Sequence, residues 1–162
     1  MKVARLDHRL RDTAEELWSL QHASYRVEAQ RIGVPDLPPL METIGDIQAS
    51  EEAFWGCADE EGELAGAVSI REERGAGACT ITRLMVRPDR FRQGIGSLLL
   101  ASVFAEYPFV RSWEVTAEAR NLPAIALYEK CGFRCVGTFA PREDIVMVKL
   151  RRRSGNNAAP RP

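Results

Sequence analysis

Two glycines and three arginines in the segment VRPDRFRQGIGSLLL, residues 86–100, have the types and spacing to bind a phosphate. Gly94 and Gly96 stand where an apolar segment of helical character begins. The first backbone N–H groups of a helix have no partner inside the helix, and the helix dipole adds partial positive charge there. Glycine at these positions removes Cβ atoms that would hold a diphosphate away. Positive charge would come from Arg87, Arg90 and Arg92. The same residues would also suit a tight turn in a solvated loop, so this segment alone leaves both interpretations open.

Two other phosphate-binding motifs fail on their residues. A Walker A loop requires a Lys-Ser or Lys-Thr pair, and neither pair occurs in the chain. A dinucleotide fingerprint requires a third glycine where Leu99 stands, although Glu114 follows Gly94 at the separation of a ribose-binding carboxylate. The three strand-like segments before the glycines also do not belong to a βαβ nucleotide fold. The remaining interpretation is a strand, a basic loop and a helix N-terminus that cradles the pyrophosphate of coenzyme A.

The downstream segment NLPAIALYEKCGF, residues 121–133, decides between these interpretations. Helical spacing puts Asn121, Ile125 and Tyr128 on one face. Together with the glycine loop, this segment resembles the GNAT N-acetyltransferase superfamily. The family pattern is a fourth strand, an R/Q-x-x-G-x-G/A loop and helix, a fifth strand, and N-x-x-A-x-x-L-Y-x-K-x-G-F. The last motif is matched by Asn121, Ala124, Leu127, Tyr128, Lys130, Gly132 and Phe133. Phe91 departs from the pattern, because the family usually has Arg or Gln there.

The resemblance implies that an acetyl group passes directly from acetyl-CoA to an amine, with no metal. In the family, the fourth and fifth strands splay apart and the pantetheine arm lies in the gap, where a backbone N–H of the fourth strand also stabilises the oxyanion. The cofactor-binding residues implied are Leu84, Met85, Val86, Arg92, Gln93, Gly94, Ile95, Gly96, Ser97, Asn121, Ala124 and Tyr128. Tyr128 matches the family's position of the acid that protonates the departing thiolate. A tyrosine of pKa about 10 is protonated at neutral pH and can give that proton. Its alternative role is that of a core aromatic residue.

The general base is less evident from the sequence. Family members often carry a glutamate on the fourth strand, where this chain has Thr80 and Thr82. Neither threonine is a base at neutral pH. Glu114, on the expected fifth strand, is one candidate for the base, and a solvent-facing strand residue is its alternative role.

The first helix provides a second candidate. Leu17, Gln21, Ser24 and Glu28 follow a single helical face. In the family, the first two helices and their connection shape the acceptor pocket. We therefore expect Glu28, together with Glu42, to line that pocket and to attract a cationic amine. The alternative is that both glutamates lie on charged, solvent-facing helix edges.

The elements that must position these residues follow from periodicity and turn chemistry. Helices are expected at residues 10–33, 40–49, 94–107 and 121–132, and strands at 2–6, 53–59, 62–72, 78–88, 111–119, 133–140 and 144–150. Thr13 and Glu16 are spaced for a capping box, and Gly33 for a helix stop. We expect the α/β (α+β) GNAT fold, a mixed and mostly antiparallel sheet of about seven strands with about four helices.

The length of the chain, its net charge and the spacing of its cysteines narrow the class of protein. The 162 residues are expected to form one domain, residues 1–150, followed by a disordered tail, residues 151–162. A net charge of −1 argues against general nucleic-acid or polybasic membrane binding. The four cysteines lack the spacing of a zinc site and are expected to be free, mostly buried thiols. With no signal peptide and no apolar run of membrane-spanning length, the expected location is the cytoplasm.

The leading hypothesis is an acetyl-CoA-dependent N-acetyltransferase. Its acceptor could be a small amine, an amino acid, an antibiotic, or a peptide or protein amine. One alternative is a non-catalytic acyl-CoA sensor that keeps the glycine loop but has lost the base. Another is a different nucleotide-binding domain. The exposed strand edge of the C-terminal hairpin is compatible with a homodimer.

Overall fold

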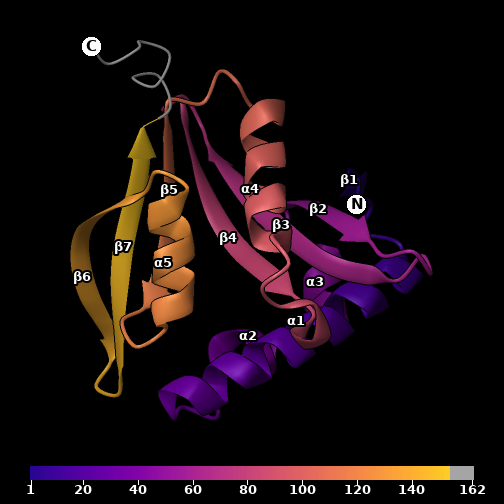
Figure 1. Ribbon diagram of the computed structural model, residues 1–162, viewed down its shortest axis with the longest axis horizontal. Helices are drawn as coiled ribbons and strands as arrows, with labels where there is room; N and C mark the ends of the chain where they lie inside the picture. The colour runs from indigo at the N-terminus through magenta and orange to yellow at the C-terminus, as the bar shows by residue number, and fades with distance from the viewer. Residues whose placement is uncertain (154–162) are drawn as a thin grey trace.

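The computed structural model describes residues 1–153 (Figure 1). The strands are β1 (Val3–Leu6), β2 (Ala53–Ala58), β3 (Leu64–Glu73), β4 (Ala78–Val86), β5 (Ser112–Glu118), β6 (Arg134–Arg142) and β7 (Ile145–Arg153). The helices are α1 (Arg11–Ile32), α2 (Pro38–Met41), α3 (Ile44–Ala49), α4 (Ile95–Glu106) and α5 (Leu122–Lys130), with a short 3-10 helix η1 (Pro88–Arg90) before α4. The order of helices and strands confirms the predicted fold class.

The seven strands form one sheet in the order β1-β2-β3-β4-β5-β7-β6. All neighbours are antiparallel except β4 and β5, which run parallel and pair only from Ala78 opposite Ser112 to Thr80 opposite Glu114. Beyond Thr80 the two strands diverge (Figure 1). In the described part of the chain, residues 81–86 of β4 therefore have no strand partner on that side. The predicted splay of the sheet is confirmed.

Helices cover both faces of the sheet. Ala14, Leu17 and Ile47 of α1 and α3 pack with Phe54 and Met85 on one face. A larger cluster fills the other face, where α4 and α5 pack; its largest buried side chains include Leu99, Leu100, Trp113, Phe133 and Leu150. A register shift between β3 and β4 at Ser69/Ile70 changes which residues of β4 face each layer. Ile81 belongs to the α4 layer and Met85 to the α1 layer, although both have odd numbers.

Two details of the predicted helices were wrong. The helix expected at residues 40–49 is two short helices, because Thr43 between them has an extended backbone (φ −95°, ψ 167°). Thr43 and Asp46 form a capping box at the start of α3, with N–H to side-chain oxygen distances of 3.0 and 2.9 Å. The capping box expected at Thr13 and Glu16 does not form, because α1 already begins at Arg11. Gly33 does end α1, with φ of 76°.

The end of the sheet also differs from the prediction. Strand β7 extends to Arg153, so residues 151–153 belong to the sheet and not to a tail. The rest of the predicted tail, residues 154–162, lies outside the described residues. The four cysteines are free thiols as expected: Cys57 and Cys79 are buried, Cys131 is half-buried and Cys135 is exposed. None of the helices in residues 1–153 is long and apolar enough to cross a membrane.

Candidate active site

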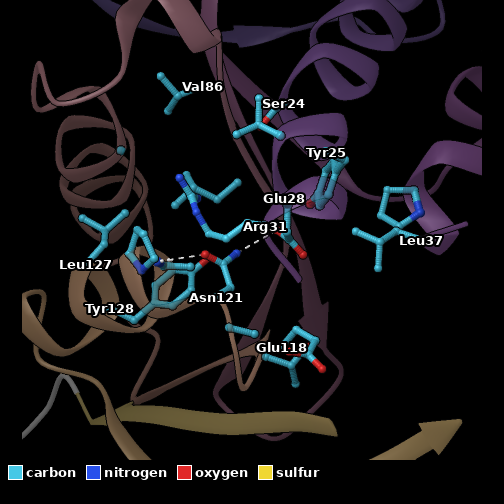
Figure 2. Close-up of a pocket in the computed structure, with 18 of the residues that line it drawn as sticks. Ser24, Tyr25, Glu28, Arg31, Leu37, Val86, Glu118, Asn121, Leu127 and Tyr128 are labelled. Carbon is cyan, nitrogen blue, oxygen red and sulfur yellow. Dashed lines mark hydrogen bonds between the residues drawn. The ribbon is translucent and has the colours of Figure 1, made fainter. Parts of the chain in front are cut away.

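A cavity of about 760 Å³ opens where β4 and β5 diverge (Figure 2). One wall is formed by α1 and the start of α2, and the opposite wall by α5 and the first turn of α4. The ends of β4 and β5 and parts of β6 and β7 complete the cavity. Its volume is in the range of sites that bind cofactors and small substrates.

The loop before α4 has the backbone of an anion-binding site. Arg92 has φ of 63° and is the one non-glycine residue with a left-handed backbone among residues 1–153. Gly94, the N-cap of α4, has φ of 79°, and a Cβ there would meet nothing within 4 Å. Left-handed residues next to a helix start turn successive N–H groups toward one concavity. Cavity-lining residues in this segment are Arg92, Gly94, Ile95, Gly96 and Ser97, without Gln93.

Gly96 has a role that the sequence did not indicate. A Cβ at Gly96 would lie 2.8 Å from Cδ2 of Leu127 on α5. This distance is shorter than carbon atoms tolerate, since their contacts are optimal at about 3.5–4.0 Å. Glycine at this position therefore lets α4 pack closely against α5, which carries Tyr128 one residue after Leu127.

Two of the three arginines expected to face a phosphate are paired with carboxylates. Arg87 Nη2 lies 2.8 Å from Asp59 Oδ2, and Arg90 Nη2 lies 2.9 Å from Glu60 Oε2. The hydrogen bond from Arg87 lowers the pKa of Asp59 to about 2. Arg92 lines the cavity and has no ion pair with any residue in the described part of the chain. Its charge is therefore available to a ligand.

The end of β4 contributes its backbone and two side chains. Leu84 and Val86 line the cavity, whereas the Met85 side chain is fully buried on the opposite face of the sheet. Any contact of Met85 with a ligand would therefore be through its backbone, as predicted for all three residues. The backbone edge of residues 81–86 that faces the cavity has no strand partner there.

Asn121 links α5 to α1 (Figure 2). As the N-cap of α5, it accepts a hydrogen bond on Oδ1 from the Ala124 N–H, at 3.3 Å. Its Nδ2 donates to Glu28 Oε1 across the cavity, at 2.8 Å. The side chain is 7% exposed, so both contacts are sheltered from water. Asn121 therefore fixes the start of the helix that carries Tyr128 and orients Glu28.

Tyr128 and Glu28 face the same cavity from opposite walls (Figure 2). Tyr128 is 6% exposed and packs edge-on against Phe133, with ring centroids 5.7 Å apart. Burial raises its pKa well above the ordinary value, so the hydroxyl keeps its proton. Burial also raises the pKa of Glu28, while the hydrogen bond from Asn121 lowers it. A raised pKa brings a carboxylate closer to the range of a general base.

Two residues of this cavity escaped the sequence interpretation. Tyr25 was not among the site residues that the sequence indicated, but its side chain lines the cavity, three residues before Glu28 on the same helix face. Burial, and next the charge of Glu28, raise the pKa of Tyr25, so its hydroxyl is also protonated. Arg31 lines the same wall one turn beyond Glu28. The helical spacing of 25, 28 and 31 was the signal that could have identified both.

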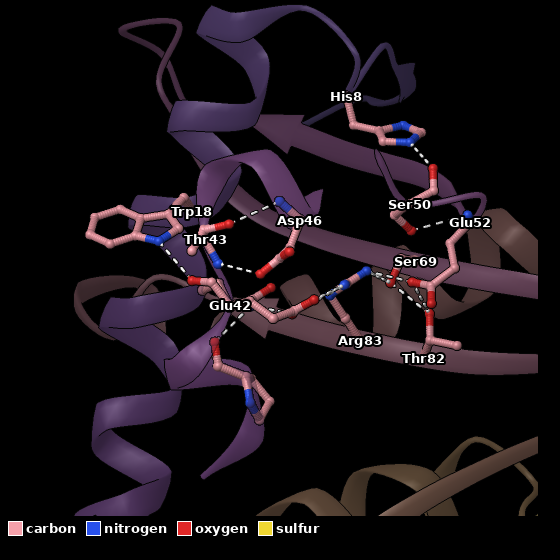
Figure 3. Close-up of polar contacts among 12 residues, drawn as sticks. His8, Trp18, Glu42, Thr43, Asp46, Ser50, Glu52, Ser69, Thr82 and Arg83 are labelled. Carbon is pink, nitrogen blue, oxygen red and sulfur yellow. Dashed lines mark hydrogen bonds and ion pairs between the residues drawn. The ribbon is translucent and has the colours of Figure 1, made fainter. Parts of the chain in front are cut away.

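Glu114 and Glu42, two other proposed site residues, do not line this cavity. Glu114 is paired with Arg151 on the neighbouring strand β7, at 2.7 Å. Glu42 accepts hydrogen bonds from Gln21 Nε2, at 2.7 Å, and from Arg83 Nη2, at 2.9 Å (Figure 3). The structure thus brings Tyr128, Asn121 and Glu28 together and leaves these two glutamates in structural ion pairs.

The Arg83 side chain lies between two glutamates. It is 9% exposed and pairs with Glu42 and with Glu52, which also accepts from the Thr82 hydroxyl at 2.8 Å (Figure 3). Glu42 follows α2, Glu52 precedes β2, and Arg83 belongs to β4. This partly buried cluster therefore ties the connection between α2 and α3 to the sheet beside the cavity.

The family model for acetyltransferases of the GNAT family matches residues 13–133, which include the loop before α4 and all of α5. The chain belongs to the GNAT family. A curated relative, the UPF0157 protein YqkA of Bacillus subtilis strain 168, is 35% identical over 142 residues. The match covers 88% of this GNAT chain but 40% of the relative, so the chain spans less than half of that protein's length.

Solved structures show the same fold. The ribosomal-protein-S18-alanine N-acetyltransferase of Escherichia coli aligns with a TM-score of 0.72 at 18% identity, over 94% of this chain and 92% of that one. An N-acetyltransferase named PaiA from Thermoplasma acidophilum, in complex with coenzyme A, aligns with a TM-score of 0.74 at 15% identity. That alignment covers 94% of this chain and 99% of the other. At these identities the likeness concerns the fold of this GNAT protein alone.

The residues of the cavity fit coenzyme A on two structural observations. Arg92 and Gly94 are left-handed, a Cβ at Gly94 would meet nothing within 4 Å, and the first residues of α4 line the cavity. The edge of β4 at residues 81–86 offers unpaired backbone groups to an extended chain such as pantetheine. Membership of the GNAT family, whose solved members include a coenzyme A complex, agrees with both observations.

Proposed function

We propose that this protein transfers an acetyl group from acetyl-CoA to a primary amine. The observation that carries the proposal is that a protonated tyrosine, Tyr128, faces a half-buried carboxylate, Glu28, across one cavity. Asn121 bonds to Glu28 and caps the helix of Tyr128, so one residue sets the positions of both. The N-terminus of α4 opens into the same cavity.

The cofactor would be held mainly by backbone groups. The first N–H groups of α4, after Gly94, would bind the pyrophosphate, and Arg92 would supply positive charge beside it. Leu84 and Val86 would pair with the pantetheine arm through the free edge of β4. When bound, acetyl-CoA supplies the activated acetyl thioester. Arg87 and Arg90 have no such role in this proposal, because acidic side chains already pair with them.

Tyr128 would act as the general acid. A thiolate leaving group has an intrinsic pKa of about 8.5 and therefore needs a proton at neutral pH. The Tyr128 hydroxyl holds one, since burial raises its pKa. Tyr25 lines the same cavity and is the one other tyrosine there among the described residues. Comparison of the two phenylalanine variants would therefore identify the acid.

Glu28 would act as the general base. An alkyl ammonium of pKa about 10 must lose a proton before its nitrogen can attack. Glu28 Oε1 is held by Asn121, and no residue of the described chain hydrogen-bonds to Oε2. That oxygen can therefore accept a proton from an amine in the cavity. Glu114 is left out of this role because it is paired with Arg151 outside the cavity.

An amine acceptor is also supported by the fold relatives. The E. coli and T. acidophilum proteins are both N-acetyltransferases, and the first acts on an alanine of ribosomal protein S18. The four free thiols suit a reducing cytoplasm, which we propose as the location. A homodimer stays a prediction, with β6 as the exposed edge strand.

The proposal is tested by mass detection of acetylated products across a panel of amines and peptides. We expect turnover by the wild type and a rate lower by at least about 100-fold for Tyr128→Phe, because general acid catalysis contributes about 100-fold or more. Glu28→Gln should lower the rate and shift its pH profile, whereas Glu114→Gln should behave as the wild type.

Equal rates for the wild type and Tyr128→Phe, with a loss in Tyr25→Phe, would transfer the role of acid to Tyr25. Tight acetyl-CoA binding without turnover of any acceptor would favour an acyl-CoA sensor over an enzyme. Detection by mass avoids thiol reagents, which would react with the exposed Cys135.

A further inference from the structure

We propose that the acceptor is a free α-amino acid with an apolar side chain. This inference rests on the proposed function and specifies the substrate class of the same cavity. Three features of the cavity carry it: a carboxylate, a guanidinium one helical turn away that has no ion pair within residues 1–153, and an apolar part of the lining. They match the ammonium, the carboxylate and the side chain of such an amino acid.

The charged groups are Glu28 and Arg31 on α1, and both line the cavity (Figure 2). Residues three apart on a helix lie on the same side, roughly 5–6 Å apart at Cβ. The charge of Arg31 acts on Glu28 at a distance, but the two side chains form no ion pair, and Arg31 has no hydrogen bond or ion pair with any residue of the described chain. A ligand with both charges can therefore satisfy both residues at once, its ammonium at Glu28 and its carboxylate at Arg31.

The cavity holds three arginines, and their pairing separates their roles. Arg90 is paired with Asp59 and Glu60. Arg92 lies in the loop before α4, where a pyrophosphate would bind. Arg31 lies on the α1 wall of the cavity, at the last turn of that helix. Of the three arginines, it is the one that neither a carboxylate nor the pyrophosphate would occupy, so it can bind a second anionic group.

Part of the same cavity is apolar. Leu37, Ile145 and Met147 line the cavity and belong to one apolar cluster that joins the end of α1 to β7. Pro38 and Pro39, at the start of α2, extend this apolar part without adding a charge or an N–H group. A branched or aromatic side chain of the acceptor would bury apolar surface there. The N-terminus of a peptide would match the site less well, because its first residue has a neutral amide in place of the carboxylate that makes the stronger, charge-assisted pair with Arg31.

The reaction balances with these groups. The acceptor nitrogen forms a bond to the acetyl carbon while the carbon–sulfur bond of the thioester breaks, giving an N-acetyl amino acid and coenzyme A. The ammonium loses two protons in total. One passes through Glu28 to solvent. Tyr128 gives its own proton to the sulfur, and the second proton of the ammonium restores the Tyr128 hydroxyl.

The test compares L-leucine with two analogues, leucinamide, which lacks the negative charge, and isoamylamine, which lacks the carboxyl group. Acetylation is followed by mass for the wild type, Arg31→Gln and a matched control, Arg26→Gln. Arg26 lies on the same helix, is exposed and does not line the cavity. We expect kcat/KM for leucine to exceed that for both analogues by about tenfold or more, as the loss of a charged hydrogen bond predicts. In Arg31→Gln this preference should fall to about one, with KM for acetyl-CoA unchanged, whereas Arg26→Gln should keep it.

Calorimetric titration of leucine and leucinamide into the protein saturated with coenzyme A separates this inference from the proposed function. Arg31-dependent binding of leucine without turnover would support the acceptor class and refute the enzyme. Turnover of peptides or leucinamide at least as fast as leucine would refute the acceptor class and leave the acetyltransferase. A raised KM for acetyl-CoA in Arg31→Gln, with the preference for leucine unchanged, would assign Arg31 to the cofactor and overturn the inference.

Discussion

Gly66 on β3 lies beneath the first turn of α4, and its replacement by alanine should disturb the loop that the proposal assigns to the pyrophosphate. A Cβ at Gly66 would lie 2.7 Å from Ile95 Cγ2, 3.1 Å from Leu99 Cδ1 and 3.1 Å from the carbonyl oxygen of Met85. Carbon contacts are optimal at about 3.5–4.0 Å, so Ile95 would have to withdraw by roughly 0.8 Å. Ile95 is 4% exposed and its β-branched side chain is stiff at χ1, so the backbone of α4 must move with it.

Overpacking of this kind costs about 1–3 kcal/mol, a large share of the roughly 5–15 kcal/mol that stabilises a domain. We expect the midpoint of urea unfolding to fall for Gly66→Ala with an unchanged slope. Gly137→Ala is the matched control, since a Cβ there would meet nothing within 4 Å. That control should stay within about 0.5 kcal/mol of the wild type.

A double-mutant cycle tests the contact itself. Ile95→Ala removes Cγ2, so Gly66→Ala should cost about 1 kcal/mol less in its presence than alone. Because the first turn of α4 follows the Arg92–Gly94 loop, Gly66→Ala should also weaken coenzyme A binding in a calorimetric titration. Gly66→Ala as stable as Gly137→Ala, or energies that simply add in the cycle, would refute the packing argument.

Three further predictions concern charged groups. Arg83→Met leaves Glu42 and Glu52 without their shared cation, and we expect the free energy of unfolding in urea to fall by about 3 kcal/mol. An unchanged midpoint would contradict this and would mean that water replaces the guanidinium. Because burial raises the pKa of Glu28, its favourable contribution is complete below the unfolded value of about 4.3 and is lost as pH rises through the folded pKa. Glu28→Gln should therefore gain stability relative to the wild type as pH rises above about 4.3, and a constant difference would contradict this assignment. The pKa of Asp59 is lowered to about 2, so its carboxylate stabilises the protein above the pKa of the unfolded chain and loses that contribution as pH falls toward 2. Asp59→Asn should therefore flatten this part of the acid unfolding profile. A profile of unchanged steepness would count against the pairing with Arg87.

The sequence predicted most of the fold because its signals are local. A β-prone run bounded by turn residues marked β4, and Gly33 and Asn121 marked helix ends that the structure contains. The helix at residues 40–49 was wrong because Thr43 has its own local partner, Asp46, which favours a new helix start over continuation. The boundary at residue 150 was wrong because strand pairing with β5 extends β7 through a polar, basic segment.

Prediction of the candidate site depended on how far apart its residues lie in the chain. The glycine loop and the Asn121–Tyr128 segment carry their spacing in a short motif, and both line the cavity. The pairing of Glu114 with Arg151, 37 residues away, depends on strand order that no local pattern encodes. The hydrogen bond between Asn121 and Glu28, 93 residues apart, was likewise not readable, although the face of Glu28 was. Tyr25 escaped because its apolar ring suits a core position as well as a cavity wall.

The central claim, acetyl transfer from acetyl-CoA to an amine in the cavity between α1 and α5, is tested most directly by the fate of an isotopically labelled acetyl group. The protein is incubated with acetyl-labelled acetyl-CoA and a mixture of amines, and the products are separated and weighed by mass spectrometry. The account predicts that the label appears in an amide, with one coenzyme A released for each amide formed, and that Tyr128→Phe slows both together. Label found only in acetate, or retained on coenzyme A that is tightly bound, would contradict it.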